Sequence, residues 1–174
     1  MSAFQSVRDY LRFILMYFAL IVAMSDEAIS SSTVRVWIID DDIQFCRDLV
    51  ALWRERAPRD QTEFHLYPTA AEALHAFRDH QHNATPHAIL IDGYLARDDG
   101  DLRYGANVVR RILKGDITPF PILIGFSADT YANDDMVAAG AIKAFQKIKY
   151  TELIVYLQSQ LPPHPLRGQK QCLT

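Results

Sequence analysis

The chain has 174 residues, 49% of them hydrophobic and 22% charged, and its formal net charge is -3. This length suits one well-packed domain and is too short for two. The small negative charge, without a basic stripe, argues against direct binding of nucleic acid. The two cysteines, Cys46 and Cys172, lack the spacing of a metal clip or of a secreted disulfide framework, which favours the cytoplasm as the location.

Residues 1–33 form an apolar segment followed by a polar linker. Phe13 to Met24 is continuously apolar, but a membrane-spanning helix needs about 20 such residues, so membrane insertion is not expected. Three interpretations stay open: a signal or anchor, a helix packed on the domain, or sequence upstream of a true start at Met24. The sequence favours the last, because the apolar run has no obvious role in a cytosolic domain and Met24 begins a plausible amino terminus.

The first predicted strand and helix follow the linker directly. Val34 to Ile39 is a short β-branched run, typical of a buried strand, and it is stopped by the acids Asp40, Asp41 and Asp42. From Ile43 to Arg56 the apolar residues recur at i, i+3, i+4 and i+7. This spacing predicts a helix, with Asp42 as its N-cap.

A second and a third strand are predicted farther along. Phe64 to Tyr67 is a weaker strand, and Thr69 to Glu72 has the S/T-x-x-E form of a capping box that starts a second helix. Ala88 to Ile91 is an apolar strand that ends abruptly at Asp92 and Gly93. The pattern of a strand followed by a helix therefore repeats.

The next segment is a polar stretch, Arg97 to Asp101, which lacks the alternating ligands and terminal Glu of an EF-hand and predicts a solvated loop. A helix is expected from near Gly105 to Gly115, with the second glycine in the C′ position. Pro121 to Phe126 forms the fourth strand, which runs into Ser127.

The last part of the chain predicts a short helix, a strand and a final helix. The short helix is placed at Asp134 to Ala139. Ala141 to Gln146 is the fifth strand, and it ends at Lys147. Thr151 is expected to cap the final helix, which Pro162 would end.

Five strands that alternate with five helices predict right-handed crossovers and a parallel sheet covered on both faces. The expected fold class is therefore α/β, a doubly wound five-stranded sheet over residues 34–161, followed by a flexible tail at residues 162–174. In such folds the ligand site lies beyond the carboxyl ends of the strands. The residues just past each strand end are therefore the candidate functional residues.

These residues supply three carboxylates, one hydroxyl and one ammonium group. They are Asp40, Asp41, Asp92, Ser127 and Lys147. Crowded carboxylates repel one another unless a cation neutralises them, and hard oxygen ligands suit Mg²⁺. Once the metal has reduced its charge, the Asp92 carboxylate can attack phosphorus, while Lys147 and Ser127 hold the phosphoryl oxygens.

In order and spacing, the segments VWIIDDD, ILIDGYL, ILIGFSAD and AFQKIK resemble the successive motifs of response-regulator receiver domains. The resemblance covers about residues 33 to 161 and implies a flavodoxin-like fold. It implies that Asp92 is the phosphoacceptor, Ser127 the hydroxyl switch and Lys147 the phosphate-binding lysine.

The same resemblance implies the metal ligands and the partners. Mg²⁺ would be bound by Asp41, Asp92 and the main-chain carbonyl of Tyr94, with Asp40 acting through water. A histidine kinase or a histidine phosphotransfer protein would donate the phosphoryl group, and a downstream protein would be the target. The chain is then a stand-alone receiver in a two-component phosphorelay, and not an enzyme beyond catalysing its own phosphorylation and dephosphorylation.

Three features depart from the family pattern. Ile148 stands where the family usually has proline, and Ala144 stands where many members carry the aromatic residue that rotates on activation. The loop from Asp92 to Gly105 is longer than is typical. Tyr94 occupies a position that tunes the lifetime of the phosphoryl group in this family, and we expect its bulk to slow hydrolysis.

Two alternatives of other classes stay open. The departures just described are compatible with a degenerate receiver that is not phosphorylated and binds protein partners constitutively. The acids from Asp40 to Asp42, with Ser127 and Lys147, are also similar to the motifs of haloacid-dehalogenase-type phosphatases, in which Asp40 would be the nucleophile. That family has an acidic pair beyond the lysine, whereas the only acid after Lys147 is Glu152, which disfavours this alternative.

Overall fold

A computed structural model describes residues 33–57, 62–79, 85–95, 97–115 and 120–161. Within these ranges the elements follow in the order β1 (Val34–Ile39), α2 (Ile43–Arg56), β2 (Thr62–Tyr67), α3 (Ala70–Asp79), β3 (Ala88–Ile91), η2 (Arg97–Arg103), α4 (Gly105–Leu113), β4 (Ile122–Ser127), α5 (Thr130–Ala138), β5 (Lys143–Gln146), η3 (Lys147–Lys149) and α6 (Tyr150–Gln160). All of them belong to one compact unit. The apolar run at the amino terminus and the tail after residue 161 lie outside the described residues.

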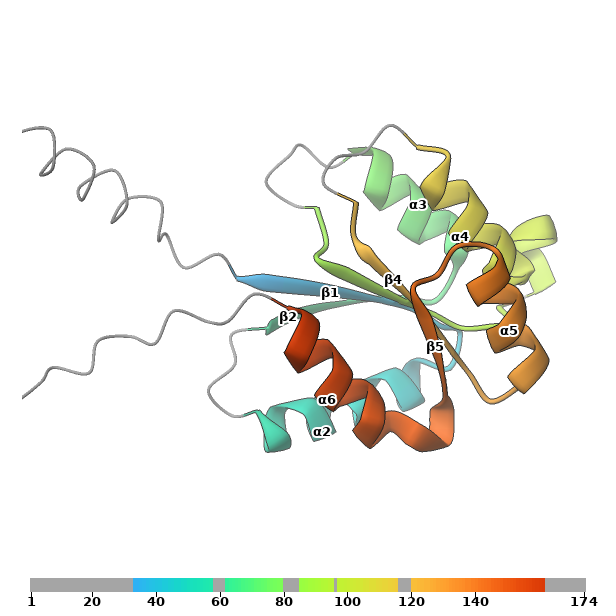
Figure 1. Ribbon diagram of the computed structural model, residues 1–174. Helices are drawn as coiled ribbons and strands as arrows, with labels where there is room; N and C mark the ends of the chain where they lie inside the picture. Colours follow the sequence, from blue (N-terminus) through green and yellow to red (C-terminus); the bar gives the residue numbers. More distant parts are fainter. Residues whose placement is uncertain (1–32, 58–61, 80–84, 96, 116–119, 162–174) are drawn as a thin grey trace, which may run out of the picture. The chain divides into compact units, whose positions relative to one another are not determined.

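The five strands form a single sheet in the order β2-β1-β3-β4-β5, and each neighbouring pair is parallel. Helices α2 and α6 cover one face of the sheet, and α3, α4 and α5 cover the other (Figure 1). The predicted fold class, a doubly wound five-stranded α/β domain, is therefore confirmed.

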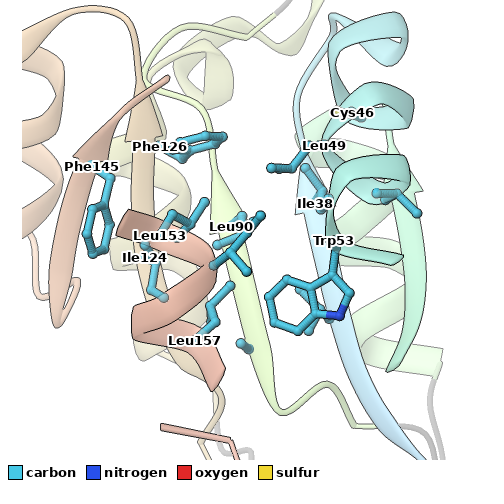
Figure 2. Packing of buried hydrophobic residues seen from close by; sticks show 14 of the residues in the cluster. Ile38, Cys46, Leu49, Trp53, Leu90, Ile124, Phe126, Phe145, Leu153 and Leu157 are labelled. Carbon is cyan, nitrogen blue, oxygen red and sulfur yellow. The ribbon is translucent and has the colours of Figure 1, made fainter. Parts of the chain in front are cut away.

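The buried strands explain why the sheet is covered on both faces. Alternate residues of β1 enter different cores, with Val36 and Ile38 on the α2/α6 side and Trp37 and Ile39 on the other side. Figure 2 shows the first core, in which large side chains of α2 and α6 meet those of the central strands. A run that is apolar at every position is what a parallel sheet with two covered faces requires.

Most predicted elements are confirmed at or near their expected bounds. β1, α2 and β3 have the bounds that the sequence predicted. Asp42 caps α2 by accepting a hydrogen bond from the Phe45 N–H at 3.0 Å, and Thr69 Oγ1 accepts one from the Glu72 N–H at 3.2 Å. The strand predicted from Phe64 begins two residues earlier, at Thr62.

Two predicted helix starts are wrong. α5 begins at Thr130 and not near Asp134, because the Asp129 side chain caps it by accepting from the Ala132 N–H at 3.1 Å. α6 begins at Tyr150, so Thr151 lies inside the helix and does not cap it. The 3₁₀ turn η3 leads directly into α6, which leaves no extended residue at position 151 for an N-cap.

Among the described residues, no helix combines the length and the apolar character that crossing a membrane requires.

Candidate functional site

The strand register places Asp40 and Asp92 next to each other. Ile39 of β1 pairs with Ile91 of β3, and each aspartate directly follows one of these two residues. The Asp92 N–H donates to the Ile39 carbonyl at 2.9 Å. Both side chains are buried, with Asp40 1% and Asp92 8% exposed. The end of the sheet therefore holds two adjacent carboxylates that water reaches poorly.

Lys147 links these two carboxylates. Its Nζ lies 2.7 Å from Asp40 Oδ2 and 3.2 Å from Asp92 Oδ2. Lys147 begins η3, directly after β5, so the chain carries it from the far edge strand to the middle of the sheet. Its ammonium group also lies 4.9 Å from the centre of the Phe45 ring. One cation thus faces two buried anions.

A third carboxylate completes an oxygen cluster. Asp40, Asp41 and Asp92 each offer one oxygen, and these three oxygens lie within 4.8 Å of one another. Asp41 is exposed, so the cluster is open to solvent on its side. An incomplete set of oxygen ligands with access to water fits Mg²⁺, which keeps several water ligands when it binds to proteins. The residues present therefore fit the metal that the sequence predicts.

The two buried acids differ in their hydrogen bonds and in their distance from Lys147. Asp40 Oδ1 accepts from the Asp42 N–H at 3.0 Å while its Oδ2 faces Lys147, so both oxygens of Asp40 have protein partners. Asp92 Oδ1 accepts from the Gly93 N–H at 2.7 Å, and its Oδ2 faces Lys147 at the longer distance. Each carboxylate thus has two protein partners, and Asp40 has the shorter contact with Lys147.

The charges in the cluster do not balance without a further cation. Burial raises the pKa of Asp40 from 3.8 to about 6, and the neighbouring Asp92 charge adds to this effect although the bond to Lys147 opposes it. Burial alone would lower the pKa of Lys147, but its hydrogen bond to Asp40 and the charges of both aspartates raise it. Lys147 therefore stays charged, while burial makes the charged form of Asp40 less favourable than it is in water, an effect that a further cation would offset.

Ser127 lies against the residue that follows Asp92. It ends β4, is 2% exposed, and its Oγ accepts a hydrogen bond from the Asp129 N–H at 3.3 Å. A Cβ on Gly93 would lie 2.6 Å from Ser127 Oγ and 2.5 Å from Ala132 Cβ. Only glycine at position 93 allows this close approach, so the hydroxyl stands beside the Asp92 loop as the sequence predicted.

The loop after Asp92 is more ordered than predicted. The polar stretch forms the 3₁₀ element η2, not a plain solvated loop, and Tyr94 pairs with Tyr104 in an isolated antiparallel bridge. The bridge bonds run from the Gly105 N–H to the Gly93 carbonyl at 2.9 Å and from the Leu95 N–H to the Arg103 carbonyl at 2.8 Å. The Tyr94 carbonyl takes no part in these bonds and remains able to bind a metal.

The Tyr94 side chain is half exposed and packs against Tyr104, with ring centroids 6.1 Å apart. Gly105 makes the return of this loop possible, because a Cβ there would lie 2.2 Å from the Asp92 carbonyl oxygen.

The two departures from the family motif are also visible. Ile148 is 82% exposed in η3, and Ala144 lies on β5 opposite Gly125.

One buried residue of the site was missed by sequence reasoning. Asn133 is 6% exposed; its Oδ1 accepts from the Ser127 N–H, and its Nδ2 donates to the Ser127 carbonyl, both at 3.1 Å. The sequence carries no distinct signal for this role, because Asn133 is followed by the polar Asp134 and Asp135, and the predicted helix start near Asp134 left Asn133 outside the helix.

A scan against protein-family models found no match, and a search of curated proteins found no similar sequence. Solved structures do resemble the chain. The phosphorylated cyanobacterial phytochrome response regulator RcpA matches with a TM-score of 0.60 and 14% identity over 78% of this chain and 99% of its own. The receiver domain of NtrX from Brucella abortus matches with a TM-score of 0.54 and 22% identity, over 72% of this chain and 97% of its own.

A CheY-like receiver domain protein from Methanospirillum hungatei gives a TM-score of 0.53 and 16% identity, over 74% of this chain and 99% of its own. Many of the structural neighbours are receiver domains. The chain therefore has the flavodoxin-like fold of response-regulator receiver domains.

Proposed function

We propose that this protein is a stand-alone response-regulator receiver that accepts a phosphoryl group on Asp92 in the presence of Mg²⁺ and thereby switches a protein-docking surface. The observation that carries the proposal is the contact of one lysine, Lys147, with two buried carboxylates in an oxygen cluster suited to a divalent cation. A histidine kinase or a histidine phosphotransfer protein is the proposed donor, a downstream protein is the proposed target, and the cytoplasm is the proposed location of this protein.

The proposed reaction is an in-line transfer. An Asp92 oxygen forms a bond to phosphorus while the bond between phosphorus and the donor imidazole nitrogen breaks, and the imidazole leaves with the electron pair. Mg²⁺, held by Asp41, Asp92 and the Tyr94 carbonyl, with Asp40 acting through water, would supply positive charge for the phosphoryl oxygens. Lys147 and the Ser127 hydroxyl would hold those oxygens as charge develops on them. Water later hydrolyses the bond between the Asp92 oxygen and phosphorus, so the protein turns over no separate substrate.

The geometry favours Asp92 over Asp40 as the nucleophile. Asp40 is the more buried of the two, and its contact with Lys147 is shorter, 2.7 Å against 3.2 Å for Asp92. A nucleophile must present an oxygen to phosphorus in a position that the donor can approach. This argues against the phosphatase alternative, in which Asp40 would be the attacking residue.

The proposal is tested by incubating the protein with acetyl phosphate and Mg²⁺ and measuring its intact mass. We expect the wild-type protein to gain one phosphoryl group, and Asp92→Asn to gain none. Asp48→Asn is a matched control, because Asp48 is an exposed aspartate on α2, outside the cluster. If the wild-type mass stays unchanged with every small phosphoryl donor, the constitutive docking module becomes the better account.

A further inference from the structure

Helix α5 is tied to the end of β4 through a side chain and not only through the sheet. Asn133 lies in the second turn of α5, and its amide group binds both the N–H and the carbonyl of Ser127. Asparagine is unfavourable inside a helix, and a buried polar side chain is tolerated only where its hydrogen bonds are made. Both requirements point to a positional role for Asn133.

The surroundings of Ser127 leave its hydroxyl little freedom. Its Oγ accepts a hydrogen bond from the Asp129 N–H on one side. On the other side, Gly93 is so close that a Cβ added at position 93 would clash with this Oγ. We therefore expect a hydroxyl that turns toward the three phosphoryl oxygens of phosphorylated Asp92 to displace the Ser127 main chain. Because that main chain is bonded at both its polar groups to Asn133, the displacement passes to α5.

The same helix is tied to the strand that carries Lys147. Gln146, the last residue of β5, donates from Nε2 to Thr130 Oγ1 at 2.7 Å. Asn133 and Thr130 also line a groove of about 480 Å³ between α5 and β5, together with Val137, Ala144 and Phe145. Ala144 is too small to fill this groove or to connect Ser127 with the surface.

We infer that Asn133 is a positioning residue that couples Ser127 to helix α5, and through α5 to the groove beside β5. This coupling replaces the one that an aromatic residue at position 144 would provide. The inference rests on the proposed function, since it concerns how phosphorylation of Asp92 is transmitted to the docking surface. Neither Asn133 nor this path from Ser127 to α5 belongs to the motif at the strand ends.

The chain contains its own reporter of α5. Met136 is fully buried on the inner side of α5, and a Cβ added to Gly125 of β4 would lie 2.8 Å from its methyl carbon. The test is therefore methyl NMR of the full-length protein, labelled with ¹³C at the methionine methyl groups, with and without beryllofluoride and Mg²⁺. Met136→Leu identifies the resonance. Binding of beryllofluoride is measured in the same titration.

In the wild-type protein we expect beryllofluoride to shift the Met136 methyl resonance. In Asn133→Ala the shift should fall about twofold or more, while beryllofluoride still binds at Asp92. Thr130→Val should reduce the shift less, because its bond is exposed. Asn107→Ala is the matched control: this asparagine of α4 also makes two hydrogen bonds, to Asp101 and Arg110, and neither reaches Ser127.

A role in folding alone is separated from coupling by two further variants. Asn133→Asp keeps the bond from the Ser127 N–H but loses the donor to the Ser127 carbonyl, and it should reduce the shift with a smaller loss of stability. Ser127→Ala keeps both main-chain bonds and removes only the hydroxyl, and it should abolish the shift without a loss of stability comparable to that of Asn133→Ala.

Three results would overturn the inference, and they differ from one another. A wild-type protein that does not bind beryllofluoride refutes the proposed function and this inference with it. Binding that leaves the Met136 resonance in place refutes the coupling alone. A full shift in Asn133→Ala shows that the motion reaches α5 by another route.

Discussion

Helices α2 and α6 on one face of the sheet and helix α5 on the other are attached to it in different ways. On one side, α2 and α6 pack large side chains such as Trp53 and Leu153 against the central strands (Figure 2). On the other side, α5 lies on β4 through Gly125 and the flexible side chain of Met136. It meets the site through Ala132, beside Gly93, and through the hydrogen bonds of Asn133 to Ser127. Helices α2 and α6 are fixed by interlocking shapes, whereas α5 is held by a small apolar contact and by hydrogen bonds that can be exchanged. The helix that can shift is the one tied to Ser127.

The largest loss of stability is expected in the α2/α6 layer. Trp53→Ala removes a side chain that is 2% exposed and that packs against Phe64 with ring centroids 5.5 Å apart. We expect a loss of about 3 to 5 kcal/mol in the free energy of unfolding, measured with urea. Val155→Ala, on the exposed side of α6, should change it by less than about 0.5 kcal/mol. If Trp53→Ala and Val155→Ala lost similar free energies of unfolding, the packing of Trp53 would not be what fixes this layer to the sheet.

The next largest effect is a gain of stability at the site. In the metal-free protein, the pKa of Asp40 in the folded state is about 6, above the value of 3.8 in the unfolded chain. This group therefore stabilises the fold fully below 3.8, and its contribution is lost as the pH rises through 6. At pH 7 the charged carboxylate costs roughly 3 kcal/mol at most, at about 1.4 kcal/mol per pH unit.

Asp40→Asn should therefore be more stable than the wild-type protein at pH 7 in EDTA, by about 1 to 3 kcal/mol. The difference should narrow as the pH falls from 7 to 5, and Mg²⁺ should stabilise the wild-type protein more than the variant. Urea unfolding at both pH values, with and without Mg²⁺, measures all of these quantities. A variant that is less stable at pH 7 would mean that the bond to Lys147 outweighs burial of the charge.

A smaller loss is expected where α5 meets β4. A Cβ at position 125 would lie 2.8 Å from the Met136 methyl carbon and 2.9 Å from Ala144 Cβ. Gly125→Ala should cost about 1 to 3 kcal/mol in urea unfolding, because overpacking forces neighbours to move. Adding Ala144→Gly removes one of the two obstacles and should restore part of this loss. If the double variant were no more stable than the single one, the close approach of α5 would not be the cause.

The smallest effect concerns the lifetime of the phosphoryl group and not stability. Tyr94→Ala should speed dephosphorylation severalfold, because the side chain that limits access of water is removed, while the free energy of unfolding changes little. Phe120→Ala is a matched control, since Phe120 is as exposed as Tyr94 but precedes β4, at the opposite end of the strand from Ser127. Equal lifetimes in the wild-type protein and Tyr94→Ala would refute the shielding role.

The strands and the residues at their ends could be predicted because their signals are local. Runs such as Val36 to Ile39 and Ala88 to Ile91 are apolar throughout, and polar residues such as Asp40 and Asp92 mark where these buried strands end. The expectation that Lys147 converges with Asp40 and Asp92 followed from the parallel sheet alone, because ligand sites lie beyond the carboxyl ends of its strands.

The remaining parts depended on contacts between distant residues. The start of α5 was placed too late because the cap at Asp129 resembles any acid in a loop. The bridge between Tyr94 and Tyr104 depends on a connection, residues 95–103, that has no hairpin signal in the sequence. The bonds of Asn133 to Ser127 become visible only when α5 is laid on β4.

The most direct test of the central claim is to locate the phosphoryl group chemically. The protein is treated with acetyl phosphate, with Mg²⁺ or with EDTA, and then reduced with borohydride, which converts an aspartyl phosphate to homoserine. Peptide mass spectrometry then identifies the modified residue. We predict homoserine at position 92, formed with Mg²⁺ and not with EDTA. Homoserine at position 40, or unmodified aspartate at both positions, would contradict the claim that this cluster makes Asp92 the phosphoacceptor.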